Sequence, residues 1–356
     1  MQRVTIKDVA RLAGVSITTV SRALNHSADI SEETRERILR ICQETGYHTN
    51  LLARSLISSK TNTLGLILPG IASPFYSSLA LNIETYAREN GYQVMLCSGR
   101  PGDGKTESLF EYLISQQVDG ILLSNSGDQA RELVRRYQDV VPTVLLGASV
   151  PDASGARINS VSTDNYSGGR IAAEYLHGLG HRDVVYLGLR PGSTTHAVRH
   201  RGFITAAQEL GMTVTTVENT ISFSTIETGY QIAQEFFSHP FTQTALFAPS
   251  DPMALGAMQV ADELGIAIPE RLSVLGFDNM EYAALPGIRL TTIAQNTARM
   301  GRAAVRLLLE LGESDSHGEN THRIIQPALI ERATCRSIII NLKTELELGA
   351  SPGPVL

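Results

Sequence analysis

Apolar residues recur with a helical period in the first 25 residues, and this pattern predicts two short helices. The inner positions of the first helix follow the i, i+3, i+4, i+7 spacing of an amphipathic helix, and they are Ile6, Val9, Ala10 and Ala13. Thr5 can cap its start, and Gly14 supplies the positive φ of the turn that ends it. Ser16 then caps a second helix, whose inner positions are Val15, Val20, Ala23 and Leu24. Two such helices around a glycine turn predict a helix-turn-helix.

The outward positions of the second helix are those that a helix-turn-helix places in the DNA major groove. They are Ile17, Thr18, Ser21, Arg22 and Asn25. Any small helical hairpin needs a cap, a glycine and two apolar stripes, so a purely structural hairpin is the alternative for this stretch. A third helix pattern runs between Ser31 and Gly46. Three helices of this length bury little core, but they are enough for a DNA-reading headpiece.

Beyond residue 61, continuous apolar runs alternate with helix patterns. The runs cover residues 64–68, 94–97, 121–123, 143–146, 184–187 and 214–217. The helix patterns cover residues 75–90, 106–117, 167–179 and 197–210. This alternation predicts parallel sheets covered by helices on both faces. Two stretches, starting at residues 65 and 184, share the order strand, loop, helix, glycine, strand, so we predict an α/β body of two similar lobes.

Three segments, VTIKDVARLAGVSITTVSRALN, SEETRERILRICQETGY and NLLARSL, resemble the headpiece of the lac repressor family of bacterial transcription regulators. The resemblance continues to about residue 340. It implies an α/β fold in which a three-helix helix-turn-helix headpiece precedes a two-lobed body of doubly wound parallel sheets, like that of periplasmic sugar-binding proteins. It also implies that residues 285–313 cross back to the first lobe and that a strand pair within 324–340 returns to the second.

The resemblance and the patterns together predict four parts of the chain. We expect a headpiece at residues 1–46, a hinge at 47–61, an effector-binding and dimerisation body at 62–340 and a flexible tail at 341–356. The tail contains no leucine heptad, so we expect a homodimer rather than a tetramer.

The hinge carries only a weak apolar stripe, and an ordinary flexible linker is one interpretation of it. The resemblance implies instead that the hinge folds against the DNA minor groove, where Leu56 inserts between base pairs. Asn50 and Arg54 would then lie beside the groove floor and the phosphates. The family usually has proline before the asparagine, whereas this chain has Thr49. That departure bears on how rigidly the hinge enters the groove.

The outward residues of the second helix have different chemistry, which predicts different roles on DNA. Arg22 can contact a guanine through two hydrogen bonds. Ile17 has no donor, so we expect it to contact a thymine methyl group and, with Thr18, to set further base preferences. The phosphate contacts are expected from Thr5, Ser16 and Ser21. In a dimer, the two headpieces would read half-sites roughly 34 Å apart, or multiples of that distance.

Ligands of open α/β sheets bind at the carboxyl ends of the strands, and the loops there carry aromatic, charged and amide side chains. Such a mixture suits a polyhydroxylated ligand, because rings stack on C–H surfaces while polar groups hold hydroxyls. The candidate effector residues are Ser73, Phe75, Tyr76, Arg199, Phe223, Ser250, Asp251, Asp278 and Gln295. Arg199 and Asp278 match the family's effector-contacting positions. We therefore expect a small, sugar-like effector.

Some of these residues have structural interpretations as well. Asp251 precedes a helix pattern and could serve only to cap it. Phe75 and Tyr76 are adjacent, so we expect one in the core and the other at the ligand. Ser250 stands where the family usually has asparagine, which should change the ligand atom that is read.

Charge separates the headpiece from the body. The net charge of −6 does not by itself suggest a nucleic-acid partner. Residues 1–60, however, contain nine Lys and Arg against six Asp and Glu, while the remaining residues contain 21 against 30. An acidic body leaves the DNA contacts to the modestly basic headpiece.

The composition also bears on compartment and chemistry. No secretory signal pattern or apolar run of about 18 residues is present, so we expect a cytoplasmic protein without membrane contact, not a periplasmic binding protein. Cys42, Cys97 and Cys335 lack metal-ligand spacing, and their odd, sparse count suits a reducing compartment. No Ser–His–Asp or Cys–His constellation is assignable, and we predict no enzyme activity, metal or cofactor.

Residues 99–106, GRPGDGKT, match the phosphate-binding pattern G-x-x-x-x-G-K-T between an apolar run and a helix pattern. The next run ends in Ser124 and Asn125, without a carboxylate for a second metal contact. We prefer a chance match in a glycine-rich loop, with an ATP-dependent enzyme as the alternative. His181, in the turn GHRD, is expected to be structural, and Asp164 and Asn165 are expected to cap the helix that follows them.

These observations predict a dimeric, sequence-specific repressor. Its affinity for operator DNA would be switched by a small effector bound between the two lobes of the body.

Overall fold

The computed structural model describes residues 4–24, 27, 29–47, 60–99, 104–124, 128–137, 139–147, 158–189, 194–218, 224–313 and 321–338. Contacts within the chain define two compact units, Met1–Thr61 and Asn62–Leu356. No helix in these ranges is long and apolar enough to cross a lipid bilayer.

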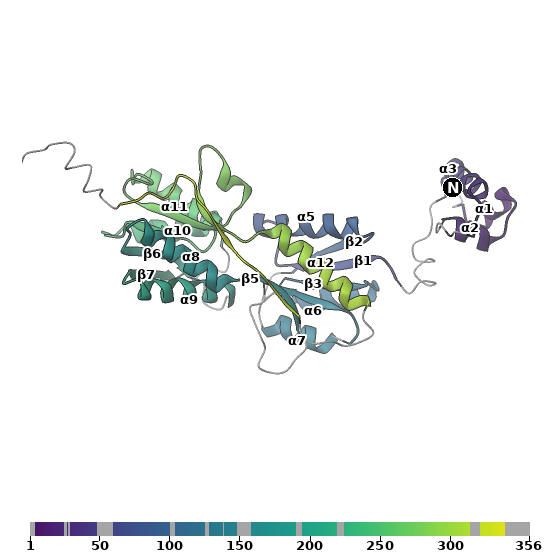
Figure 1. The fold of residues 1–356 in the computed structure, drawn as a ribbon, viewed down its shortest axis with the longest axis horizontal. Helices are drawn as coiled ribbons and strands as arrows, with labels where there is room; N and C mark the ends of the chain where they lie inside the picture. The colour runs from purple at the N-terminus through teal and green to yellow at the C-terminus, as the bar shows by residue number, and fades with distance from the viewer. Residues whose placement is uncertain are drawn as a thin grey trace, which may run out of the picture. The chain divides into compact units, whose positions relative to one another are not determined.

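The first unit contains the three predicted helices, α1 (Ile6–Ala13), α2 (Ile17–Leu24) and α3 (Glu32–Thr45) (Figure 1). Gly14 and Gly46 end α1 and α3 with φ of 66° and 65°, as the helix-stop pattern predicts. The small core contains the predicted inner residues Val9, Ala10, Ala13, Val20 and Ala23 together with Ile38 and Cys42 of α3, and the other predicted inner residues, Ile6, Val15 and Leu24, are partly buried against it. The helix-turn-helix prediction is therefore confirmed.

The first lobe of the second unit is a six-stranded parallel sheet with strand order β11-β5-β4-β3-β1-β2. Its strands are β1 (Thr63–Leu68), β2 (Gln93–Ser98), β3 (Gly120–Leu123), β4 (Thr143–Leu146), β5 (Asn159–Thr163) and β11 (His322–Ile325). One apolar core packs α5 (Pro74–Glu89) and α12 (Thr297–Glu313) on one face of the sheet. A second core packs α6 (Lys105–Ser115) and α7 (Asp128–Tyr137) on the other face.

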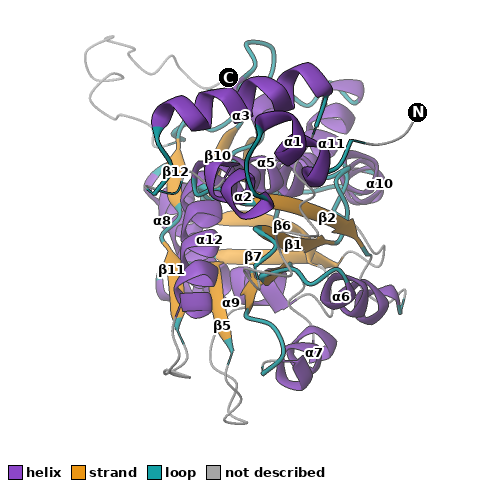
Figure 2. Cartoon of the chain, turned by 90° about the vertical axis from the view of Figure 1, so that its right-hand side faces the viewer, coloured by secondary structure: helices purple, strands orange, loops and turns teal. Residues whose placement is uncertain are grey.

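The second lobe repeats this plan with strand order β12-β10-β9-β8-β6-β7. Its strands are β6 (Asp183–Leu189), β7 (Thr213–Glu218), β8 (Ala245–Phe247), β9 (Ser273–Asp278), β10 (Thr291–Ala294) and β12 (Ala328–Ile330), of which β12 is antiparallel to β10. One face carries α8 (Asn165–Gly178) and α9 (Thr194–Glu209), and the other carries α10 (Ile226–Phe237) and α11 (Asp251–Glu263). Figure 2 shows the strands of the body in orange with helices around them.

Three described connections pass between the lobes: β5 to α8, β10 to α12, and β11 to β12. The return of α12 to the first lobe agrees with the sequence-based expectation. The expectation for the last strands was wrong in part, because β11 pairs with β5 in the first lobe and only β12 joins the second. The reason is positional: α12 packs on the first lobe, so the strand that follows it extends the sheet of that lobe.

Candidate functional site

The headpiece exposes most of the predicted outward positions at the start of α2. Ser16 precedes the helix and its Oγ accepts a hydrogen bond from the Thr19 amide at 3.1 Å, so it is the predicted N-cap. Ser16, Ile17, Thr18 and Arg22 are exposed, and Ser21 is half-buried. Ile17 is 44% exposed although it is apolar, which leaves its side chain available to a partner surface.

Thr5 begins α1 through a capping box with Asp8. Its amide and its Oγ both donate to the Asp8 carboxylate, at 3.0 Å and 2.7 Å. These bonds from Thr5 are the main reason that the pKa of Asp8 lies below its usual value, and Arg11 contributes through an ion pair. A phosphate would have to compete with Asp8 for the Thr5 hydroxyl proton. Four further predicted DNA contacts, Asn25, Asn50, Arg54 and Leu56, lie outside the described residues.

Arg199 of α9 is a buried charged residue of the second lobe and is only 3% exposed. It donates to the Pro249 carbonyl, which follows β8, and to Asn165 Oδ1 at 2.8 Å. Its Cζ lies 3.3 Å from the ring centroid of Phe277, at the end of β9. Burial lowers the pKa of Arg199, and the negative charge of Asp278 opposes that shift.

Two glycines place Arg199 beside Asn165. A Cβ at Gly169 of α8 would lie 2.1 Å from the Arg199 carbonyl oxygen, and a Cβ at Gly202 of α9 would lie 2.1 Å from the Tyr166 carbonyl oxygen. Only glycine at both positions lets α8 and α9 approach this closely. Asp164 and Asn165 were both expected to cap α8, but only Asp164 does so, accepting a hydrogen bond from the Ser167 amide at 2.9 Å. Asn165 is the first residue of α8 and bonds Arg199 instead.

Asp278 and Gln295 meet at the ends of β9 and β10. Gln295 Nε2 donates to Asp278 Oδ1, and Gln295 Oε1 accepts from Thr163 Oγ1 of the first lobe at 2.9 Å. Gln295 is buried, whereas Asp278 is only partly buried. Burial raises the pKa of Asp278, and the Arg199 guanidinium lowers it. The carboxyl ends of β5, β9 and β10 thus bring the side chains of Thr163, Asp278 and Gln295 together. Asp278 and Gln295 are predicted effector residues, and Thr163 is not.

Asp251 lies at the start of α11 but does not cap it, because Ser250 occupies the N-cap position. The Asp251 carboxylate is fully buried and accepts from Thr292 Oγ1 at 2.5 Å and from the Met280 amide at 2.7 Å. Burial raises the pKa of Asp251, and the nearby charge of Asp278 raises it further. Both carboxylate oxygens are therefore bound by the protein itself.

Three of the remaining predicted effector residues, Ser73, Phe75 and Tyr76, lie at the start of α5. Ser73 is the N-cap residue of α5, without a side-chain capping bond. Phe75 and Tyr76 do not differ in burial: both are half-buried, both pack against the first-lobe core, and their rings contact edge to face at 5.2 Å. Tyr76 also acts on the pKa of Arg199. Phe223 lies outside the described residues.

Several buried polar atoms near this cluster have no hydrogen-bond partner within the described ranges. They are Arg199 Nε, Tyr186 Oη, Ser250 Oγ and Tyr282 Oη. Asn165, Tyr186 and Tyr282 were not among the predicted effector residues. The sequence could have indicated two of them only by their position, because Asn165 follows β5 and Tyr282 follows the turn at Asp278. Neither position distinguishes a ligand contact from a helix cap or a core residue.

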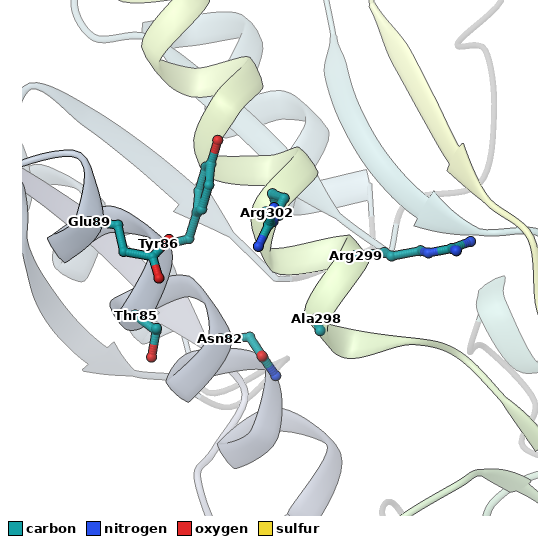
Figure 3. Close-up of a pocket in the computed structure, with 7 residues that line it drawn as sticks. All are labelled: Asn82, Thr85, Tyr86, Glu89, Ala298, Arg299 and Arg302. Carbon is teal, nitrogen blue, oxygen red and sulfur yellow. The ribbon is translucent and has the colours of Figure 1, made fainter.

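A groove of about 380 Å³ lies between α5 and α12 of the first lobe. Its lining residues are Asn82, Thr85, Tyr86, Glu89, Ala298, Arg299 and Arg302. Figure 3 shows Arg302 near Tyr86, with the guanidinium 5.1 Å from the ring centroid, while Arg299 points away. None of the residues that surround Arg199 and Asp278 lines this groove.

The glycine-rich segment 99–106 lies only partly within the described residues. Gly104 precedes α6 with φ of 70°, Lys105 is exposed, and Thr106 is buried. His181 is buried and bonds Thr244 Oγ1 through Nδ1 at 2.8 Å, as expected for a structural histidine.

Known proteins share both units of this chain. Residues 5–50 match the family model for bacterial regulatory proteins of the lacI family, and residues 173–335 match that for a periplasmic binding protein-like domain. The HTH-type transcriptional repressor PurR of Pasteurella multocida is 31% identical over 335 residues, covering 94% of this chain and 99% of that protein. The chain belongs to the lacI family of bacterial regulatory proteins.

Solved structures of this family have the same fold. The lac repressor dimer bound to operator and the anti-inducer ONPF is 26% identical, with a TM-score of 0.83, and the match covers 94% of this chain and 100% of that one. The complex of the transcriptional regulator CelR with cellobiose is 30% identical, with a TM-score of 0.67 and coverage of 93% and 100%. This LacI-family protein is thus a transcriptional regulator and not an enzyme, so the ATP-dependent alternative for residues 99–106 is not supported.

Proposed function

We propose that this LacI-family regulator is a homodimeric, operator-binding repressor, whose body binds a small polyhydroxylated effector where its two lobes meet. The observation that carries the proposal is the chain of polar contacts from Thr163 of the first lobe through Gln295 to Asp278 of the second. A ligand that bonds Asp278 or Gln295 would act on both lobes at once.

The DNA-binding part of the proposal assigns the headpiece 1–46 to one operator half-site and the hinge 47–61 to its centre. The exposed start of α2 would enter the major groove, with Arg22 and Ile17 on base edges and Ser16 at the backbone. The similarity to a lac repressor dimer solved on its operator supports both the partner and the dimer. A regulator that binds operator DNA in a bacterium would act in the cytoplasm.

The effector-binding part assigns the body 62–340 to a sugar-like ligand and leaves 341–356 as a tail. Asp278 offers acceptor oxygens, Gln295 and Asn165 offer amides, and the unpartnered Ser250 Oγ and Arg199 Nε add further polar atoms. A buried cluster of mixed donors and acceptors beside aromatic rings is typical of sites for neutral polyols. The similarity to CelR, which was solved with cellobiose, supports this ligand class.

Effector binding would regulate DNA binding by changing the angle between the lobes. Such a change alters the spacing of the two hinges in a dimer and with it the operator affinity. A ligand can shift this equilibrium only by its difference in affinity for the two lobe arrangements. Contacts on both sides of the Thr163–Gln295 link would supply that difference.

The deciding experiment is a thermal-shift screen of the full chain against monosaccharides, disaccharides, sugar acids and nucleobases. A ligand that binds only the folded state raises the melting temperature with concentration, by mass action. We expect a sugar or sugar derivative to do so and to change the affinity for duplexes selected from a random pool. Stabilisation by nucleobases alone would contradict the sugar-like class. Absence of preference for any duplex would contradict operator binding.

A further inference from the structure

Asp278 and Asn279 have backbone conformations that favour glycine, although both residues carry a Cβ. Their φ angles are 114° and 57°. Non-glycine residues persist in such conformations only where neighbouring groups hold them. The turn directly follows β9 and carries the carboxylate that Gln295 contacts. Whatever holds this turn therefore also sets the position of the Asp278 side chain.

One buried pair of side chains binds two consecutive amides of the turn. Asp251 accepts from the Met280 amide at 2.7 Å and from Thr292 Oγ1 at 2.5 Å. Thr292 Oγ1 in turn accepts from the Asn279 amide at 3.3 Å. Arg332 adds an outer contact, donating to Asn279 Oδ1 at 2.6 Å. The pair Asp251–Thr292 thus joins α11 and β10 to the strained turn.

We infer that Asp251 is a positioning residue for effector binding and does not contact the effector itself. Together with Thr292 it holds the turn of residues 278–280, so that the Asp278 side chain is presented to the effector. Both Asp251 oxygens are bound by the protein, and the side chain is 0% exposed. Gly276 closes one side of it, since a Cβ there would lie 2.4 Å from Asp251 Oδ1. This inference rests on the proposed function and changes the role expected for Asp251 from contact to positioning.

Substitution of Thr292 tests the positioning without removing the buried carboxylate. Thr292→Val has nearly the same shape but neither donates to Asp251 nor accepts from Asn279, whereas Thr292→Ser keeps the hydroxyl. Ser273→Ala is the matched control, because the buried Ser273 also accepts a hydrogen bond from a backbone amide, that of Arg336 at 3.1 Å, but at the opposite end of β9.

Hydrogen–deuterium exchange of the full chain, followed by mass spectrometry, reports on the turn itself. In Thr292→Val we expect the amides of residues 279 and 280 to exchange about tenfold faster or more, with the β9 amides unchanged. Thr292→Ser and Ser273→Ala should leave the turn as in the wild-type chain. Equal exchange at 279 and 280 in Thr292→Val and wild type would overturn the inference, as would a uniform increase across the body.

Sugar binding supplies the functional measurement, with cellobiose and D-ribose as the probes. For whichever sugar stabilises the wild-type chain, Thr292→Val should weaken affinity about tenfold and Thr292→Ser should restore it. An unchanged affinity in Thr292→Val would overturn the positioning role. If neither sugar stabilises the wild-type chain, the ligand class of the proposed function fails for these probes, and the exchange result alone decides whether the pair holds the turn.

Discussion

Thr163 and Gln295 join the two lobes through a hydrogen bond of 2.9 Å from the Thr163 hydroxyl to the Gln295 amide oxygen. Both side chains are buried, and each lies where the chain leaves a strand to enter the other lobe. The amide nitrogen of Gln295 donates to Asp278, so one side chain links a first-lobe strand end to a second-lobe carboxylate. A change in the angle between the lobes would have to alter this link.

The link should contribute measurably to the stability of the body. Gln295→Leu removes the hydrogen bonds that Gln295 makes with the Thr163 hydroxyl and the Asp278 carboxylate, which we expect to lower the free energy of unfolding by about 1–3 kcal/mol. Thr163→Val should cost a similar amount, and the double variant less than the sum of both, because the two side chains share one bond. Urea denaturation of the four proteins measures this cycle. Strictly additive losses would show that the bond contributes nothing.

Asp278 should affect the effector response without affecting operator binding in the absence of effector. Asp278→Ala removes the partly buried acceptor at the lobe junction, and we expect affinity for the effector to fall about tenfold or more. Operator affinity of the unliganded protein should remain as in wild type, because the headpiece is a separate compact unit. Fluorescence anisotropy on a selected duplex, with and without effector, measures both quantities.

Asp262→Ala, at an exposed position of α11, is the control for this experiment. Arg199→Ala should likewise lose the response, but also stability, since Arg199 holds Asn165 and the Pro249 carbonyl. A full effector response in both Asp278→Ala and Arg199→Ala would refute the proposed site.

The sequence patterns predicted the elements whose periods are strong in the first part of the body, and two of the elements they missed there, β5 and α7, are weakly apolar. β5 (Asn159–Thr163) is absent from the predicted strands, since its buried residues include Ser160, Ser162 and Thr163 in place of an apolar run. α7 has a short inner stripe among charged residues and was missed for the same reason. Burial of hydroxyl groups in a strand depends on partners supplied by other strands, and local pattern carries no information about those.

The site was predictable as a set of loops but not as a set of contacts. The Asn165–Arg199 hydrogen bond depends on the close approach of α8 and α9 at Gly169 and Gly202. This contact joins residues far apart in the sequence, and the two glycines alone do not predict it. The role of Asp251 could not be predicted from the sequence pattern either. A carboxylate after a strand suits a ligand, a cap or a backbone clamp equally well, and only the path of the turn at residues 278–280 distinguishes them.

Arg22 should determine one base preference of the proposed operator. If its guanidinium bonds a guanine through two hydrogen bonds, Arg22→Ala should relax selection at that one position, at a cost of about 1–3 kcal/mol for the preferred base. Selection from a random duplex pool, followed by sequencing, measures the change. Arg40→Ala on α3 is the control. Equal weakening for all sequences would instead identify Arg22 as a phosphate contact.

Ser16 has two proposed roles, which two substitutions can separate. Ser16→Ala removes the bond to the Thr19 amide, and we expect the headpiece to lose about 0.5–2 kcal/mol of stability. Ser16→Asp keeps a good N-cap but adds a negative charge at a position that we expect to face a phosphate. Ser16→Asp should therefore fold like wild type and bind DNA more weakly, as calorimetry and anisotropy would show. Unchanged DNA affinity in Ser16→Asp would exclude the phosphate contact.

The buried Asp251 and the partly buried Asp278 should make the body less stable as the pH rises. Burial raises the pKa of both carboxyls above the ordinary value of 3.8, although Arg332 acts against this at Asp251 and Arg199 at Asp278. Above the ordinary pKa, the unfolded chain loses these protons while the folded body retains them, so the folded state binds more protons and its stability falls with pH. Asp251→Asn cannot titrate and should lose less stability than wild type between about pH 5 and about pH 8. Urea denaturation at both pH values measures the difference, with Asp262→Asn as the control at an exposed position. If Asp251→Asn loses stability as steeply as wild type, the pKa of Asp251 is not raised.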